Sequence, residues 1–200
     1  MESSSITKIA AVLLVIVLLH LVSQNEAAVT STSTRVPAKY TDFIKTKCNT
    51  TTYPYPCLKT LLPYAASVRG NATKMSVAAL KVAVQGARNA TLAVKDMKKK
   101  KGISTEEGAI LRDCIDDLKD AVYELRDTLD AMEHLGDEDG QFEWDNAKTY
   151  ASAVITDIDS CMDGFSGRKV DAARKRQIRN LIYYVTQLAS NALSLVTHLY

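Results

Sequence analysis

Cysteines and histidines are the residues of this chain with the greatest capacity for chemistry, and there are four of the first and three of the second. The cysteines are Cys48, Cys57, Cys114 and Cys161. Their even number and the absence of a Cys-x-x-Cys pair favour disulfide formation. His134 and His198 have no serine or cysteine nucleophile nearby in pattern, and the sequence contains neither a His-x-x-x-His zinc pair nor a Gly-rich phosphate loop. We therefore expect no catalytic, cofactor-binding or metal-binding residues.

Carboxylates are the other reactive groups, with 23 Asp and Glu residues against 25 Lys and Arg residues. Glycoside hydrolysis needs two carboxylates across a cleft, which a small packed chain of helices does not offer. The formal net charge of +2 also lacks the strongly basic character of a nucleic-acid-binding domain. We expect most of these carboxylates to lie on solvated helix faces.

The N-terminus indicates which reaction the cysteines undergo. Lys8 precedes the apolar run IAAVLLVIVLLHLV at residues 9–22, and small residues follow at Ala27 and Ala28. The run has about 14 residues, whereas a membrane-spanning helix needs roughly 20. It therefore predicts a cleaved secretory signal peptide over residues 1–27, with no membrane contact afterwards. In an oxidising extracellular compartment the cysteines are expected to form disulfides.

Entry into the secretory pathway also gives meaning to three Asn-x-Thr triplets without a central proline. They begin at Asn49, Asn71 and Asn89. Each triplet matches the acceptor pattern for N-glycosylation. We predict a glycoprotein with up to three modified positions.

The elements that position these residues are predicted to be helices. Apolar residues recur in alternating steps of three and four within the segments 80–97, 111–132, 144–165 and 178–199. This spacing places them on one face of a helix. Short links separate the segments, so the fold class is predicted to be all-α, with an up-down-up-down four-helix bundle over residues 74–200.

Capping residues mark where these helices should begin and end. The lysines at 98–101 and Gly102 suit a helix C-terminus, because cations stabilise that end and glycine tolerates the left-handed cap. Ser104 and Glu107 have the spacing of a capping box, in which each side chain accepts a hydrogen bond from a backbone N–H. The Gly-containing residues 136–140 predict the turn between the second and third helices.

The cysteine positions give an independent test of this topology. Cys114 and Cys161 lie on the apolar stripes of consecutive helices, and their midpoint in the chain falls inside the predicted turn at 136–140. Residues equally far from a turn lie level in antiparallel helices, so these two can form a disulfide. Of the three connectivities that four cysteines allow, we predict Cys48 with Cys57 and Cys114 with Cys161.

The first of these bonds encloses Pro54 and Pro56, which interrupt a continuous helix. We predict short helices at 40–47 and 58–62, within an N-terminal disulfide-stapled helical hairpin over residues 40–66 that caps or extends the bundle. Residues 28–39, which are rich in Thr and Ser, predict a flexible mature N-terminus.

The near-neutral total charge conceals two charged stretches. From Arg112 to Glu133 there are eight acidic and three basic residues, and from Arg168 to Arg179 there are six basic residues and one acidic residue. Two interpretations are open. The stretches pair with each other on the protein surface, or one or both bind a charged partner, with charge complementarity setting register and association rate.

Four segments in this order resemble the plant invertase and pectin methylesterase inhibitor family. They are TDFIKTKCNTTTYPYPCLKTL at 41–61, LRDCIDDLKDAVYELRDTLDAM at 111–132, YASAVITDIDSCMDGF at 150–165 and SNALSLV at 190–196. The resemblance covers the chain from about Tyr40 and implies an inhibitor domain over residues 40–200. The predicted cysteine pairing agrees with that of the family.

The resemblance implies a non-enzymatic protein of the apoplast or cell wall. Such a protein forms a non-covalent one-to-one complex with a pectin methylesterase and covers its substrate cleft. In pectin methylesterase inhibitors, polar and acidic residues beside the third and fourth cysteines face the enzyme. In this chain the matching positions are Asp116, Asp120, Ser160 and Asp163. Ser160 stands where the family usually has threonine.

Two alternatives remain open at this point. Inhibitors of cell-wall or vacuolar acid invertase in the same family carry Pro-Lys-Phe just before the third bundle helix. The stretch GQFEWDNAKTYASA has Phe142 there without the Pro and Lys, which favours pectin methylesterase as the target. The second alternative is a pectin-binding wall protein without inhibitory activity, in which the cations of Arg168 to Arg179 hold de-esterified pectin.

Overall fold

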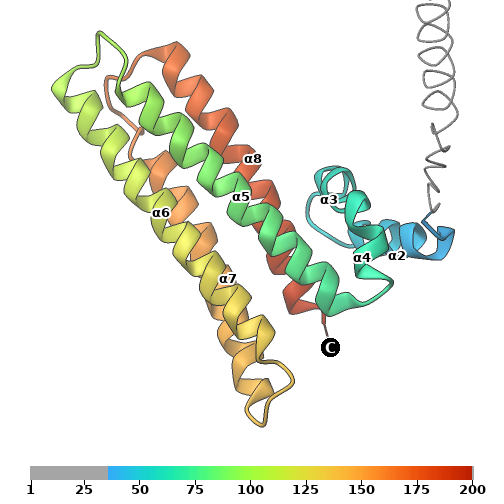
Figure 1. Ribbon diagram of the computed structural model, residues 1–200. Coiled ribbons are helices and arrows are strands. Elements are labelled where there is room, and N and C mark those ends of the chain that lie inside the picture. Colours follow the sequence, from blue (N-terminus) through green and yellow to red (C-terminus); the bar gives the residue numbers. More distant parts are fainter. Residues whose placement is uncertain (1–35, 200) are drawn as a thin grey trace, which may run out of the picture. The chain divides into compact units, whose positions relative to one another are not determined.

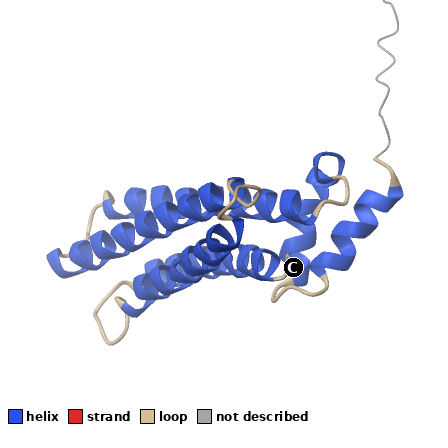
Figure 2. Ribbon diagram, turned by 90° about the horizontal axis from the view of Figure 1, so that it is seen from below, coloured by secondary structure: helices blue, strands red, loops and turns tan. Residues whose placement is uncertain are grey.

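The computed structural model describes residues 36–199, and within that range it contains helices and loops but no strand (Figures 1 and 2). Four long helices form the bundle: α5 (Ala72–Lys98), α6 (Thr105–Glu133), α7 (Gly140–Asp163) and α8 (Ala172–Thr197). Helices α5 and α7 each pack against both α6 and α8. Short loops join consecutive helices, so the up-down-up-down bundle is confirmed (Figure 1). The predicted signal peptide, residues 1–27, lies outside the described residues.

The predicted apolar stripes form the core of this bundle. Residues of the first two stripes are buried throughout, and in the third stripe only Trp144 is half-buried. The indole N–H of Trp144 donates to the Val196 carbonyl at 3.0 Å, which ties α7 to the end of α8. Helices α5 and α8 pack closely at Gly86. A side chain at this position would clash with α8, because its Cβ atom would lie only 2.6 Å from Leu188 Cδ1.

Side-chain caps begin three of the long helices. Asn71, Ser104 and Asp171 each accept a hydrogen bond from the backbone N–H three residues further on, at 2.8, 3.1 and 2.8 Å. Such caps satisfy donors that have no partner within the helix. The start of α6 at Ser104 therefore follows the sequence prediction.

The second half of the predicted capping box at Ser104 is wrong. The Glu107 carboxylate does not return to the backbone of its own helix. It accepts from the Asp171 backbone N–H at 3.3 Å and forms an ion pair with Arg174 at the start of α8. The Glu107 side chain is only 6% exposed. Burying a carboxylate without a charged partner costs more free energy than leaving one backbone N–H of a helix end without a side-chain cap.

Both disulfides follow the predicted pairing. Cys48 is bonded to Cys57 and Cys114 to Cys161, with Cα atoms 5.5 and 4.1 Å apart. The second bond cross-links α6 to α7 through the core. Sequence separations of 9 and 47 residues correspond to about 2.5 and 4 kcal/mol of stabilisation in the loop-entropy model.

The N-terminal hairpin contains α2 (Ala38–Cys48), α3 (Pro54–Leu61), a 3-10 turn η1 (Leu62–Tyr64) and α4 (Ala65–Val68). Helix α2 begins two residues inside the segment expected to be flexible. The prediction that Pro54 and Pro56 lie outside the second short helix is wrong. In the first turn of a helix the backbone N–H groups have no helical partner, so prolines there remove no hydrogen bond.

A buried amide docks this hairpin on the bundle. Asn191 of α8 is 3% exposed; its Oδ1 accepts from the Tyr53 backbone N–H at 2.9 Å, and its Nδ2 donates to the Tyr53 carbonyl at 2.8 Å. The Tyr53 ring also meets the Tyr183 ring edge-on, with centroids 6.2 Å apart. Helix α3 contacts both α5 and α8, so the hairpin extends the bundle core.

Candidate functional site

The α6–α7 pair carries the four residues that the family motif indicates, and the Cys114–Cys161 bond sets its register. Asp116, Asp120, Ser160 and Asp163 are all exposed. Because the helices are antiparallel, Asp120 lies about 9 Å along the axis to one side of the disulfide and Asp163 about 3 Å to the other. The structure therefore places the four residues on one helix pair without gathering them at one point.

Asp120 belongs to a group of carboxylates that the sequence analysis did not single out. We call Asp117, Asp120 and Glu124 of α6 with Asp157 of α7 the acidic seam. Burial raises the pKa of Asp117, and the charges of neighbouring carboxylates, Asp157 first among them, raise it further. The pKa of Asp157 is raised by burial and then by Asp120. The seam is thus a place where partly desolvated negative charges repel one another.

Glu124 is the residue of the seam at which burial and repulsion between like charges are most evident. Its pKa is raised by burial and then by the charges of Asp127, Asp157 and Asp120, in that order. One of its carboxylate oxygens, Oε2, is buried and has no hydrogen-bond partner among the described residues. The positions 117, 120 and 124 repeat the steps of three and four of the core stripe, and that repeat was the available sequence signal for the seam.

Asp116 has a different environment from the seam. Its Oδ1 lies 2.6 Å from Lys119 Nζ. The hydrogen bond from Lys119 lowers the pKa of Asp116, and the charges of Lys119, Arg112 and Lys98 lower it further. The pKa of Asp116 is therefore shifted in the opposite direction from those of Asp117, Glu124 and Asp157, so Asp116 keeps its charge to lower pH than these three carboxylates do.

Ser160 and Asp163 occupy the last turn of α7. The Ser160 hydroxyl donates to the Thr156 carbonyl at 3.0 Å, which leaves its oxygen free to accept a hydrogen bond from a partner. Asp163 is the last residue of α7, and its carbonyl accepts from the Ser166 backbone N–H at 2.9 Å.

Some cations of the basic stretch from Arg168 to Arg179 make contacts within the protein. Arg174 pairs with Glu107, and the Lys175 ammonium donates to the Phe165 carbonyl at 2.6 Å. Two of the six cations are therefore engaged internally. Among the described residues, the Glu107–Arg174 pair is the only ion pair between α6 and α8, so the acidic and basic stretches do not neutralise each other along their length.

The three candidate glycosylation positions are exposed. Asn49 follows the last residue of α2, Asn71 caps α5 and Asn89 lies within α5, where its Oδ1 accepts from Gln85 at 2.8 Å. Glycosylation of these residues stays a prediction.

Within the part of the chain that the structure describes, no group of three or more His, Cys, Asp or Glu side chains could hold a metal ion. Across the same residues, no helix combines the length and the apolar character needed to cross a membrane.

Comparisons with known proteins give a consistent result. The model of the family described as plant invertase/pectin methylesterase inhibitor matches residues 42–195. The 21 kDa protein of Daucus carota is 33% identical over 159 residues, which cover 78% of this chain and 82% of that protein. Pectinesterase inhibitor 4 of Arabidopsis thaliana is 31% identical over 162 residues, 80% of this chain and 81% of that protein. The crystal structure of a mutant form of a pectin methylesterase inhibitor from Arabidopsis shares the fold, with a TM-score of 0.62 and 20% identity over 78% of this chain and 97% of that one.

Proposed function

Because this chain belongs to the plant invertase/pectin methylesterase inhibitor family, we propose that it is a secreted inhibitor of a plant pectin methylesterase. The observation that carries the proposal is similarity over about four-fifths of the chain to proteins named pectinesterase inhibitors. The family is one of inhibitors, so this protein acts by binding rather than by catalysis. Its place of action is the apoplast, where it modulates the methylesterification of cell-wall pectin.

The proposed mode of action is a non-covalent one-to-one complex in which the α6–α7 face covers the substrate cleft of the enzyme. The Cys114–Cys161 bond supports this role, because a cross-linked helix pair loses little conformational freedom on binding. Exposed Asp116 and Asp120 and the acidic seam would meet a basic enzyme surface and accelerate association. Ser160 and Asp163 would add polar contacts at the end of α7.

Purified mature protein tests the proposed activity. We expect it to lower methanol release from methylesterified pectin by a plant pectin methylesterase and to leave acid invertase unchanged. Inhibition of invertase alone would move the assignment to the other target class of the family. Inhibition of neither enzyme would refute the proposal and favour a wall-binding protein without inhibitory activity.

The contact face is tested by a double variant, Asp116→Ala with Asp120→Ala. We expect inhibition to weaken at least about tenfold, which is about 1.4 kcal/mol of binding free energy. The melting temperature should hardly change, because both side chains are exposed. The matched control is Glu133→Ala with Asp137→Ala, which removes two exposed carboxylates, one at the C-terminus of α6 and one in the loop that follows it. Equal loss in both variants would indicate a non-specific charge effect, and a large drop in melting temperature would assign the two aspartates to the fold.

A further inference from the structure

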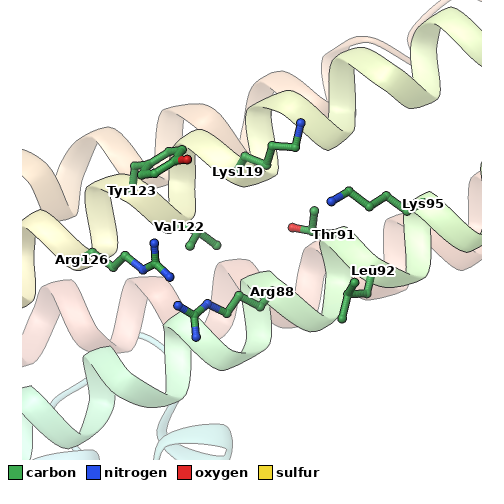
Figure 3. A pocket seen from close by; sticks show the side chains of 8 residues that line it. All are labelled: Arg88, Thr91, Leu92, Lys95, Lys119, Val122, Tyr123 and Arg126. Carbon is green, nitrogen blue, oxygen red and sulfur yellow. The ribbon is translucent and has the colours of Figure 1, made fainter.

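A second charged feature lies on the α5 side of α6, in a groove with a volume of about 310 Å³ (Figure 3). Its main lining residues are Arg88, Leu92 and Lys95 of α5 and Lys119, Tyr123 and Arg126 of α6. We call this the basic groove. Its lining, all in the described part of the chain, includes four cations and no carboxylate.

The cations of the basic groove form two rungs. Arg88 and Lys95 are seven residues apart on α5, and Lys119 and Arg126 are seven apart on antiparallel α6. Figure 3 shows Arg88 beside Arg126 toward one end of the groove, with Lys95 and Lys119 toward the other. Seven residues of helix span about 10.5 Å, so the positive charge repeats along the groove.

The row continues past the second rung. An adjoining groove of about 420 Å³ shares Lys95 and Lys119 and adds Lys98, Lys99 and Arg112. Arg112, Lys119 and Arg126 recur at intervals of seven and are all the cations of α6. The carboxylate in this lining is Asp116, which pairs with Lys119. Helix α6 therefore turns its cations toward α5 and keeps its acidic seam beside α7.

Three of the four cations in the basic groove have no intramolecular partner in the part of the chain that the structure describes. Within the described residues, no ion pair or hydrogen bond engages the side chains of Arg88, Lys95 or Arg126. Tyr123 and Leu92 flank them with exposed fractions of 60% and 58%. Elsewhere in the row, Lys119 pairs with Asp116 and Lys99 with Asp96. A row of cations that is only partly paired, beside an exposed aromatic ring, fits a ligand that is anionic, extended and partly apolar on its faces.

We propose that the basic groove binds a polyuronate chain, the de-esterified form of pectin. A polyuronate presents carboxylates at a regular repeat along an extended chain, as the rungs present cations along the groove. The faces of its sugar rings carry C–H groups that pack on Tyr123 and Leu92. The choice of a polyuronate among regular polyanions rests on the proposed function, because removal of methyl esters from pectin produces this chain.

The basic groove and the acidic seam lie on different sides of α6, toward α5 and toward α7. A polyuronate in the basic groove therefore leaves Asp120 and the seam open to an enzyme, and of the proposed enzyme contacts only Asp116 borders the adjoining groove. The inhibitor would be retained where de-esterified pectin has accumulated, which is where its target has been active.

Direct binding of the full-length mature protein to oligogalacturonate at low salt tests the proposal without any enzyme present. We expect binding to oligogalacturonate and none to the fully methylesterified oligomer. The groove variant Arg88→Gln, Lys95→Gln, Arg126→Gln should bind at least about tenfold more weakly. The control variant Arg168→Gln, Arg176→Gln, Arg179→Gln removes three exposed cations outside the groove and should stay within about twofold of the unmodified protein. Both variants leave the Lys119–Asp116 pair intact.

Several results would overturn the proposal. These are unchanged binding in the groove variant, an equal loss in the control variant, and equal or tighter binding of polyglutamate, which would indicate an acidic polypeptide ligand. If the groove variant does not fold, amide chemical shifts of the unmodified protein decide the matter. Oligogalacturonate should perturb α5 and α6 around the groove, and perturbation confined to 168–179 would refute the site. Inhibition of pectin methylesterase by the groove variant, measured in parallel, separates failure of this site from failure of the proposed function.

Discussion

Replacement of Glu107 by alanine should be among the most destabilising single changes in this protein. The side chains of Glu107 and Arg174 are 6% and 15% exposed, so Glu107→Ala leaves a guanidinium buried without its anion. It also removes the acceptor of the Asp171 backbone N–H. Breaking a buried pair from one side costs about 3–5 kcal/mol. For a domain of this size such a loss lowers the melting temperature by roughly 10 °C.

Thermal and chemical unfolding followed by circular dichroism measure this effect. The matched control is Glu106→Ala, the adjacent exposed residue in the same helical turn, which should cost less than about 1 kcal/mol through its interaction with the helix dipole. A double variant, Glu107→Met with Arg174→Met, should recover most of the loss, because well-packed apolar residues often replace a buried ion pair without penalty.

Two results would refute this reasoning about Glu107. One is a loss below about 1 kcal/mol in Glu107→Ala, which would mean that the pair is solvated or easily replaced. The other is a double variant no more stable than Glu107→Ala, which would mean that the unpaired Arg174 charge is not the source of the cost.

Acidification and loss of the hairpin anchor provide the remaining predictions. The raised pKa values of Asp117, Glu124 and Asp157 mean that these three groups bind protons more tightly in the folded state than in the unfolded state, so their contribution to stability should rise as pH falls from neutral through these pKa values and be lost as pH rises again. Asp157→Asn should raise the melting temperature at pH 7 and reduce the contribution of the seam that acidification brings, and an unchanged pH profile would contradict the seam. Asn191→Ala should cost about 2 kcal/mol by leaving the Tyr53 backbone groups unpaired. Hydrogen exchange should then accelerate in α2–α4 before the bundle, and unchanged protection there would show that Asn191 is not the anchor.

The helices of the bundle were predictable because their signals are local. The stripe from Leu80 to Met97 follows from a period of 3.6 residues, and the start of α6 follows from a capping serine at Ser104. The Cys114–Cys161 bond was predictable for a related reason. Two residues equally distant from a turn must lie level if the helices are antiparallel, whatever the rest of the bundle does.

The start of α3 at Pro54 differs from the sequence prediction, because a proline breaks a helix in its interior but not in its first turn. A proline in the first turn removes a donor that has no acceptor, and its fixed φ suits the helix. The information was present in the sequence, but the position of the proline within the helix decides its effect, and that position depends on where the preceding turn ends.

Charge was the property that the sequence described least well. By itself the sequence determined four amphipathic helices, their order, their disulfides and an excess of acid on the second bundle helix, because each of these depends on residues close together or on a simple register. The tertiary structure decided that Glu107 pairs with Arg174, that Asp157 joins the acidic seam and that Arg126 faces α5 beside Arg88. The net charge of a helix does not say on which side of the helix each charged residue lies. Packing against the neighbouring helices decides this, and it places the carboxylates of the acidic seam beside α7 and the cations of α6 toward α5.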